Sequence, residues 1–198
     1  MKIYITTNTS LGAKCKSWAI RNIPNDYQIT DNLDDSDIFF SVFYNKILSQ
    51  DFILKRKRLF NFHAGILPEY RGSGTINWAI INQEKKTGVT LHEIDRGIDQ
   101  GDIIDIECIH ILDNDTAYDL YARLEDKVFI MFKKWFNDLI HFKYKSIPQS
   151  RNTGTLYTRQ DLKNAKDLTR FVRAFEFLDL ENAFYFNRKG EKIYLKFD

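Results

Sequence analysis

Two short apolar segments place the strongest constraint on the fold of this chain. Residues 37–43 (DIFFSVF) and 58–62 (RLFNF) are almost continuously apolar and do not alternate strictly between apolar and polar residues. A strand with this pattern is buried on both faces, as in a parallel sheet that is covered by helices. Because strands and helical stretches alternate along the chain, we expect an α/β domain with a mostly parallel sheet.

The remaining stretches predict further elements of the same α/β domain. Apolar residues between Leu120 and Leu139 recur on one helical face, which makes the segment after Thr116 the clearest helix. Thr116 can cap that helix, and Ser73 or Thr75 can cap a shorter one. The predicted elements are strands at residues 2–7, 37–43, 58–62, 88–94 and 102–112, and helices near residues 11–19, at 75–81 and after 116.

The last quarter of the chain differs in composition from the part before it. A polar loop from about residue 146 is followed by a helical stretch near residues 159–175 and by two aromatic runs around residues 187–190, which predict a β-hairpin. We therefore divide the chain into a main domain of residues 1–145 and an extension of residues 146–198. An isolated hairpin is marginal in water, so this one is expected to pack on the main domain or on a second subunit.

Composition limits the kinds of partner that the chain can have. With 198 residues and 43% hydrophobic content it can bury one substantial core, and a formal net charge of +2 gives no electrostatic footprint for nucleic acid. Cys15 and Cys108 lie far apart in the sequence and suggest neither a disulfide framework nor a zinc site. There is no secretion signal and no apolar run of about 20 residues, so we expect a soluble cytoplasmic protein.

Asn61 and His63 are the first candidate site residues. They flank Phe62 at the end of an apolar strand, so the alternation of side chains points both to the same side. The carboxyl edge of a parallel sheet is where α/β domains place their ligand crevice. By itself a histidine at a strand end is more often structural. The loop that follows, residues 64–74, is long and rich in glycine, which is typical of a shaped functional loop.

A second polar turn, residues 95–102 (DRGIDQGD), lies between two predicted strands. Its acidic residues are compatible with a structural turn or with a divalent metal. The spacing lacks the twelve-residue calcium-loop pattern and its terminal glutamate, so we predict no metal site.

Three segments occur together in a distinctive order and spacing: Asn61-Phe62-His63, then residues 67–72 (LPEYRG), then residues 88–101, with Asp95, Gly97, Asp99 and Gly101 at alternate positions. In this combination the chain resembles the folate-dependent formyltransferase family. The resemblance is strongest over residues 37–112. It implies a Rossmann-like formyltransferase fold with a mostly parallel sheet, and a catalytic set of Asn61, His63 and Asp99.

The chemistry that the resemblance implies suits these residue types. An amine attacks the formyl carbon of 10-formyltetrahydrofolate, the co-substrate, and the formyl oxygen gains negative charge. Asn61 would donate to that oxygen, His63 would stabilise it or carry a proton, and Asp99 would orient the imidazole and relay a proton through water. No covalent enzyme intermediate and no metal is required, so Cys15 and Cys108 are interpreted as structural.

The resemblance also implies binding residues and an acceptor. The folate ring would be held by backbone groups of two loops, at Lys46, Ile47 and Leu48 and at Asp95 and Ile98; core packing is the alternative for Ile47 and Leu48. The segment Tyr70, Arg71 and Gly72 resembles the sugar and tRNA branches of the family, and residues Tyr70, Arg71, Gly72 and Ser73 would bind the substrate. Residues 154–162 and 173–175 resemble the sugar N-formyltransferases, which favours a nucleotide-linked amino sugar as the substrate and a homodimer, with no nucleic acid partner and no membrane span.

One departure from the family is that the part before residue 37 is short, so at least one strand and one helix of the expected fold are predicted to be missing. Two other functions stay open. A folate-dependent hydrolase would use the same three residues with water in place of the amine, and a binding module would keep the fold without activity. A purine-pathway acceptor is a further alternative.

Overall fold

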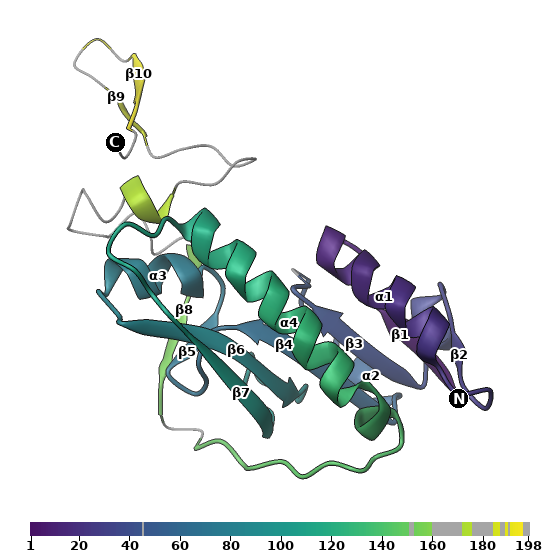
Figure 1. The fold of residues 1–198 in the computed structure, drawn as a ribbon. Coiled ribbons are helices and arrows are strands. Elements are labelled where there is room, and N and C mark those ends of the chain that lie inside the picture. Colours follow the sequence, from purple (N-terminus) through teal and green to yellow (C-terminus); the bar gives the residue numbers. More distant parts are fainter. Residues whose placement is uncertain are drawn as a thin grey trace.

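The computed structural model describes residues 1–44, 46–150, 153–159, 172–175, 184–186, 189 and 191–195. A twisted six-stranded sheet with helices packed against it dominates the described part (Figure 1). The strand order is β2-β1-β3-β4-β6-β7. The strands are β1 (Lys2–Ile5), β2 (Gln28–Ile29), β3 (Ile38–Val42), β4 (Arg58–Ala64), β6 (Lys86–Glu93) and β7 (Ile103–His110).

The sheet is mostly parallel, as the sequence predicts. β2, β1, β3 and β4 run in the same direction, β6 is antiparallel to β4, and β7 is antiparallel to β6. The two central strands are the apolar segments that predicted the fold, and every residue of β3 is buried. The α/β architecture inferred from the sequence is therefore confirmed.

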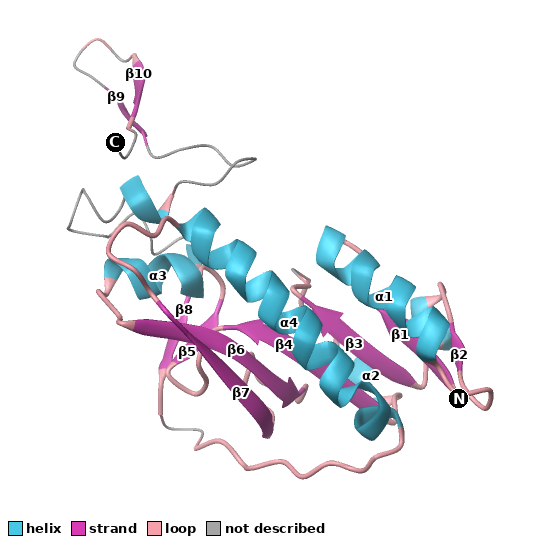
Figure 2. Ribbon diagram, viewed as in Figure 1, coloured by secondary structure: helices cyan, strands magenta, loops and turns pink. Residues whose placement is uncertain are grey.

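Different helices and aromatic side chains pack on the two faces of the sheet. Helices α1 (Ser10–Asn22) and α4 (Ala117–Ile140) lie side by side on one face (Figure 2). There the Phe62 ring packs 5.8 Å from that of Phe132, which in turn meets Trp18 at 6.0 Å. On the opposite face the Phe39 ring packs 5.4 Å from Phe52 of the short helix α2 (Gln50–Leu54). The larger hydrophobic core thus lies on the α1/α4 side and leaves the other face of β4 and β6 for polar groups.

The caps of two helices test the sequence predictions. Thr116 caps α4 as predicted, in a capping box with Asp119. The cap prediction for α3 (Thr75–Ile81) is wrong: Gly74 occupies the cap position with a left-handed φ of 76° and no side-chain cap. Ser73 instead accepts a hydrogen bond from the Arg159 backbone N–H, and the Thr75 hydroxyl donates to the Ala64 carbonyl. Glycine is suited to this position because it adopts positive φ without strain.

Beyond residue 145 the structure describes separate segments. Strand β5 (Tyr70–Gly72) pairs in parallel with β8 (Thr155–Tyr157), and β9 (Phe184–Phe186) pairs antiparallel with β10 (Lys192–Tyr194), which confirms the predicted hairpin. Residues 172–174 are helical; most of the helix expected at 159–175 lies outside the described residues. The division at residue 145 stays a prediction.

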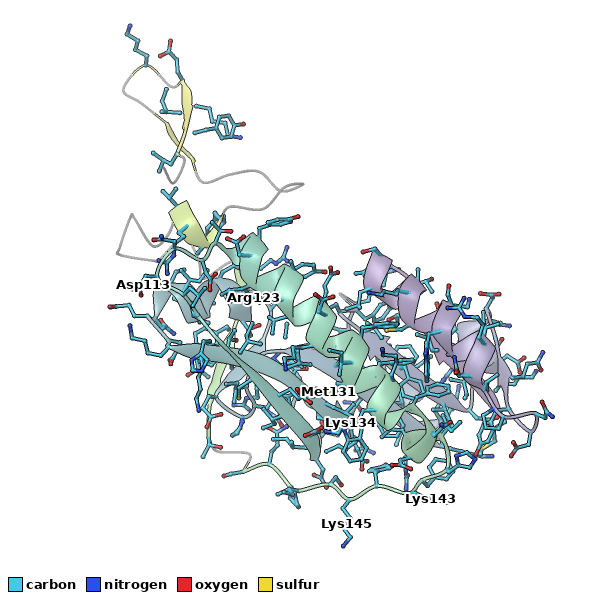
Figure 3. All side chains as sticks on the ribbon, viewed as in Figure 1. Asp113, Arg123, Met131, Lys134, Lys143 and Lys145 are labelled. Atoms are coloured by element: carbon cyan, nitrogen blue, oxygen red, sulfur yellow. The ribbon has the colours of Figure 1, made fainter. Side chains whose placement is uncertain are left out.

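The side chains of the described residues are drawn in Figure 3, where Met131 of α4 belongs to the buried core and Lys143 and Lys145 are exposed. Among the helices of the described residues, none has the length and apolar character needed to cross a membrane.

Candidate active site

Asn61 and His63 project from the face of β4 that is turned away from α4. The residues between and before them, Phe62 and Phe60, belong to the hydrophobic core on the opposite side, because successive side chains of a strand alternate between faces. The pair lies within the last four residues of β4, which ends at Ala64, so it is near the strand end as the sequence predicted. Both side chains lie over the face of the sheet.

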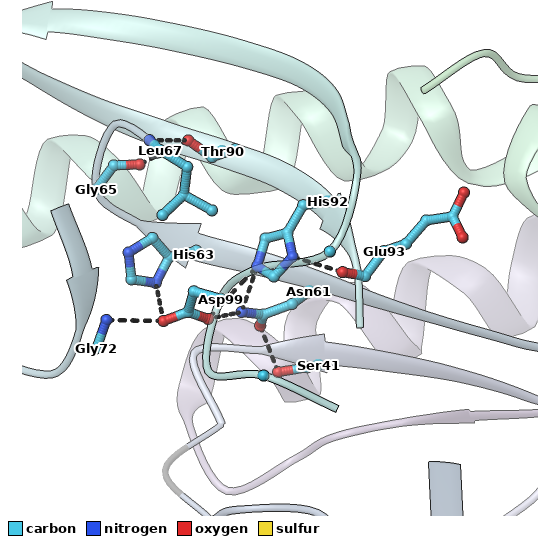
Figure 4. A network of polar contacts seen from close by, with 12 residues as sticks. Ser41, Asn61, His63, Gly65, Leu67, Gly72, Thr90, His92, Glu93 and Asp99 are labelled. Carbon is cyan, nitrogen blue, oxygen red and sulfur yellow. Dashed lines mark hydrogen bonds and ion pairs between the residues drawn. The ribbon is translucent and has the colours of Figure 1, made fainter. Parts of the chain in front are cut away.

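Asp99 reaches this face from the loop between β6 and β7, as Figure 4 shows. Its Oδ1 accepts a hydrogen bond from Asn61 Nδ2 at 3.2 Å, and its Oδ2 accepts one from the Gly72 backbone N–H at 2.9 Å. The same Oδ2 lies 3.5 Å from His63 Nδ1. A carboxamide, an imidazole and a carboxylate from two separate segments thus converge, as the sequence predicted.

The Asn61 amide is fixed by partners on both sides. Its oxygen accepts a bond from the Ser41 hydroxyl of β3 at 2.6 Å, and its nitrogen meets both Asp99 and His92 Nε2, the latter at 3.1 Å. Both N–H groups therefore point toward the same polar space as His63. One of these N–H groups must change partner before Asn61 can donate to another molecule, which is common in ligand-free sites.

The His63 ring has a distinct role for each nitrogen. Nε2 lies 2.6 Å from the Tyr70 carbonyl, which can only accept, so we assign the proton of the neutral ring to Nε2. Nδ1 is then a lone pair that faces Asp99. A proton added at Nδ1 would form a charge-assisted bond to that carboxylate, so the arrangement is suited to accepting one proton. Gly65 allows the ring this position, because a Cβ there would come within 2.8 Å of Nε2.

His92 is a residue of this site that the sequence reasoning missed. It is 2% exposed, its Nδ1 lies 2.6 Å from the Glu93 carbonyl, and its Nε2 lies 3.5 Å from Asp99 Oδ1. The antiparallel register places it directly opposite Asn61. Its alternation with Thr90 on a predicted strand was the available signal, but local sequence does not reveal the register that brings it to Asn61.

The electrostatics of the site favour a negative Asp99 and a neutral His63. Burial alone would raise the pKa of Asp99, but His63, His92 and the Gly72 N–H outweigh that effect and hold the pKa well below its usual range. Burial lowers the pKa of His63, and His92 adds to this, while Asp99 and the Tyr70 carbonyl oppose it. The net shift for His63 is downward.

These shifts predict how acid affects stability. The pKa of Asp99 is lower in the folded chain than in the unfolded one, so acid protonates this carboxylate in the unfolded state first. The stabilisation that the Asp99 carboxylate gives to the folded state is therefore lost as the pH falls below about 4. The lowered pKa of His63 acts in the same direction below about pH 6.5. Between about pH 5 and pH 3, the range in which aspartate titrates, the free energy of unfolding should decrease less in the Asp99→Asn variant than in the wild type. Urea denaturation at each pH would measure this difference.

The exposed Asp113 provides the control for that experiment, since Asp113→Asn should keep the acid sensitivity of the wild type. Parallel stability curves for Asp99→Asn and the wild type would contradict the assigned direction for Asp99.

The predicted folate-binding residues lie on two loops. Lys46, Ile47 and Leu48 follow β3, and Ile47 is 86% exposed, so the core-packing alternative is wrong for it. Asp95 accepts a bond from the Gly97 N–H at 2.8 Å, and Ile98 is 45% exposed in the loop that carries Asp99. Their role as cofactor contacts stays a prediction.

The predicted substrate segment contributes to the site mainly through its backbone. The Tyr70 carbonyl and the Gly72 N–H contact His63 and Asp99. The Arg71 side chain is buried and donates to the Gly154 carbonyl at 3.2 Å, and the Ser73 hydroxyl contacts the backbone of Arg159. Tyr70 also stacks on Tyr157 with ring centroids 4.9 Å apart. Substrate contacts by these side chains remain a prediction.

The described residues contain no group of three or more histidine, cysteine or acidic residues arranged to hold a metal ion. Cys15 is buried, and burial raises the pKa of its thiol to about 12, which makes it a poor nucleophile. Cys108 is exposed on β7.

Comparisons with known proteins indicate the family to which the chain belongs. Residues 18–133 match the family model described as formyl transferase. The chain is 50% identical over 90 residues to the bifunctional polymyxin resistance protein ArnA of Wigglesworthia glossinidia brevipalpis, covering 44% of this chain and 14% of that protein. It thus spans only a small part of this curated relative's length.

Two solved structures extend the comparison to all or most of the chain. A 4-N formyltransferase from Francisella tularensis superposes with a TM-score of 0.83 at 22% identity, covering 100% of this chain and 98% of that one, so the compact arrangement has a counterpart there. WlaRD, described as a sugar 3N-formyl transferase in the presence of dTDP and 5-N-formyl-THF, gives a TM-score of 0.77 at 29% identity over 89% of this chain and 80% of that one. The family model covers more than half of the chain and includes Asn61, His63 and Asp99, and the chain belongs to the formyl transferase family.

Proposed function

We propose that this chain transfers a formyl group from 10-formyltetrahydrofolate to the amino group of a nucleotide-linked amino sugar. The observation that carries the proposal is the convergence of Asn61, His63 and Asp99 on one face of the sheet in a member of the formyl transferase family. The likeness to WlaRD, solved with a nucleoside diphosphate and a formyl folate, supports the choice of substrates.

The three residues divide the chemistry between them. When the amine attacks the formyl carbon, the formyl oxygen becomes negative, and an Asn61 N–H released from Asp99 or His92 donates to it. The attacking nitrogen must lose a proton, which His63 Nδ1 accepts because its Nε2 already carries one. The resulting imidazolium is stabilised by Asp99 at 3.5 Å. The proton then passes to the folate nitrogen that leaves, directly or through water.

The binding assignments follow the same division. The loops at Lys46, Ile47 and Leu48 and at Asp95 and Ile98 hold the folate, and residues Tyr70 to Ser73 bind the acceptor. The loop that presents Asp99 also presents Ile98, so folate binding and the catalytic carboxylate depend on one backbone segment. We further infer that the chain forms a homodimer, because β9 and β10 form a sheet of their own and a two-stranded hairpin is marginal without a packing surface. We also infer a cytoplasmic location.

An acceptor screen tests the proposal. The full chain is incubated with 10-formyltetrahydrofolate and a panel of nucleotide-linked amino sugars, and tetrahydrofolate release is followed by absorbance with mass spectrometry of the sugar. We expect tetrahydrofolate release that requires one amino sugar and yields a product heavier by one formyl group. Formate release without any amine would instead support the hydrolase reading, and formylation of a purine-pathway amine alone would overturn the sugar assignment.

A further inference from the structure

The segment that follows α4 is tied to both ends of the loop that carries Asp99. Ile147 and Ile103 exchange backbone hydrogen bonds of 2.8 and 2.9 Å at the start of β7. At the end of β6, the hydroxyls of Tyr144 and Ser146 donate to the Glu93 carboxylate at 3.1 and 3.2 Å. In Figure 1 this segment runs along the sheet from the end of α4 toward β8. It therefore lies where it can contact residues 94–102.

Gln149 makes the direct contact to that loop. Its Nε2 donates to the Asp99 carbonyl at 3.1 Å and to the Gly101 carbonyl at 2.6 Å. Two carbonyl acceptors fix the orientation of the amide, because a flipped amide would place its oxygen against both. The Gln149 Oε1 is buried and has no hydrogen-bond partner in the described structure. An unpaired buried acceptor is costly, and the two hydrogen bonds that the amide donates offset that cost.

The backbone on either side of these carbonyls needs such support. Asp99 has a φ of 50°, in the left-handed region that costs a non-glycine residue energy and persists only where the surroundings hold it. Gly101 lies so close to β6 that a Cβ would come within 1.9 Å of the Glu93 carbonyl oxygen. Gln149 bridges these two residues. Releasing it would let the loop relax toward an unstrained conformation.

We propose that Gln149 is a positioning residue: it holds the backbone of Asp99 so that the carboxylate meets Asn61, His63 and the Gly72 N–H. This role deepens the proposed formyl transfer and rests on it. Among the described residues, the hydrogen bonds of the Gln149 side chain go to the loop backbone, and its effect on the reaction passes through Asp99. The groups that face His63 are then Asp99 from the loop, His92 from β6 and the Tyr70 carbonyl from β5.

The test compares Gln149→Met, which keeps the length of the side chain and removes both donors, with the wild type. We expect kcat to fall by about 10²-fold, as for a misplaced catalytic group, with little change in KM for the amino sugar. The pKa of His63, followed by NMR of its ring, should fall further, since Asp99 is the larger of the two groups that raise it. Ser150→Ala, at the exposed neighbouring position, is the matched control and should change neither quantity.

A second variant keeps the proposal falsifiable. Gln149→Leu removes the N–H donors without adding a charge, and it should shift the His63 titration in the same direction. A lower melting temperature with unchanged kcat and unchanged His63 titration would show a purely structural role and overturn the proposal, as would global unfolding of both variants. If the wild type transfers no formyl group, the proposed function fails, whereas the His63 titration still decides whether Gln149 positions Asp99.

Discussion

Replacing His63 with asparagine should lower kcat/KM for formyl transfer by about 10²- to 10⁴-fold, the usual range for loss of a general acid or base. Asparagine retains a polar side chain of similar reach but cannot take up a proton at the position of Nδ1. The ring is 7% exposed, so water cannot readily replace it. Initial rates of tetrahydrofolate release with the acceptor identified in the screen would measure the change.

The pH profile separates this role from a structural one. Because the pKa of His63 is lowered, the wild type should keep a neutral base down to below about pH 6.5 and lose activity only under more acidic conditions. The residual activity of His63→Asn should lack that acidic limb. His110, exposed on β7, is the matched control, and His110→Asn should behave as the wild type. An acidic limb that survives in His63→Asn would assign it to another group.

Replacing Asn61 with alanine should lower kcat by about 10²- to 10³-fold, as for removal of one donor to a developing oxyanion. The loss should fall on kcat more than on the KM of either substrate, because the donor acts mainly where negative charge develops. Steady-state kinetics with each substrate varied in turn would measure this division.

The control for the asparagine experiment is Asn114→Ala, at an exposed position after β7, which should leave both parameters unchanged. Thermal melting should accompany both variants, since Asn61 also bonds to Ser41, His92 and Asp99. A loss confined to KM would mean that Asn61 binds the ground state and does not stabilise the oxyanion.

The sheet was predictable from sequence because its signal is local. The continuous apolar run of β3 and the single-face pattern of α4 each follow from spacing within one segment, and the side-by-side orientation of Asn61 and His63 follows from alternation along one strand. The short elements β2, β5, β8 and α2 were missed. Two to five residues carry too little periodicity to distinguish them from a loop.

The site was only partly predictable, because its remaining geometry depends on contacts between distant segments. Asp99 was assigned through a family resemblance, whereas its contact with Asn61 depends on how the loop after β6 folds back over the sheet. His92 and Gln149 were not identified at all: one depends on the β4–β6 register and the other on the path of the chain after α4. The cap of α3 was also predicted wrongly, because the backbone at the cap position has a left-handed conformation, which Gly74 adopts.

In β4, residues at even positions contribute to the hydrophobic core, and residues at odd positions contribute to the candidate active site. Phe60 and Phe62 are set into the apolar interior, while Asn61 and His63 are turned to the reactive side. The effect of substitutions should therefore alternate with residue number. Changes at the even positions should lower the melting temperature, and changes at the odd positions should alter the reaction in a chain that still folds. Evolution could thus retune the reaction without rebuilding the interior that supports it.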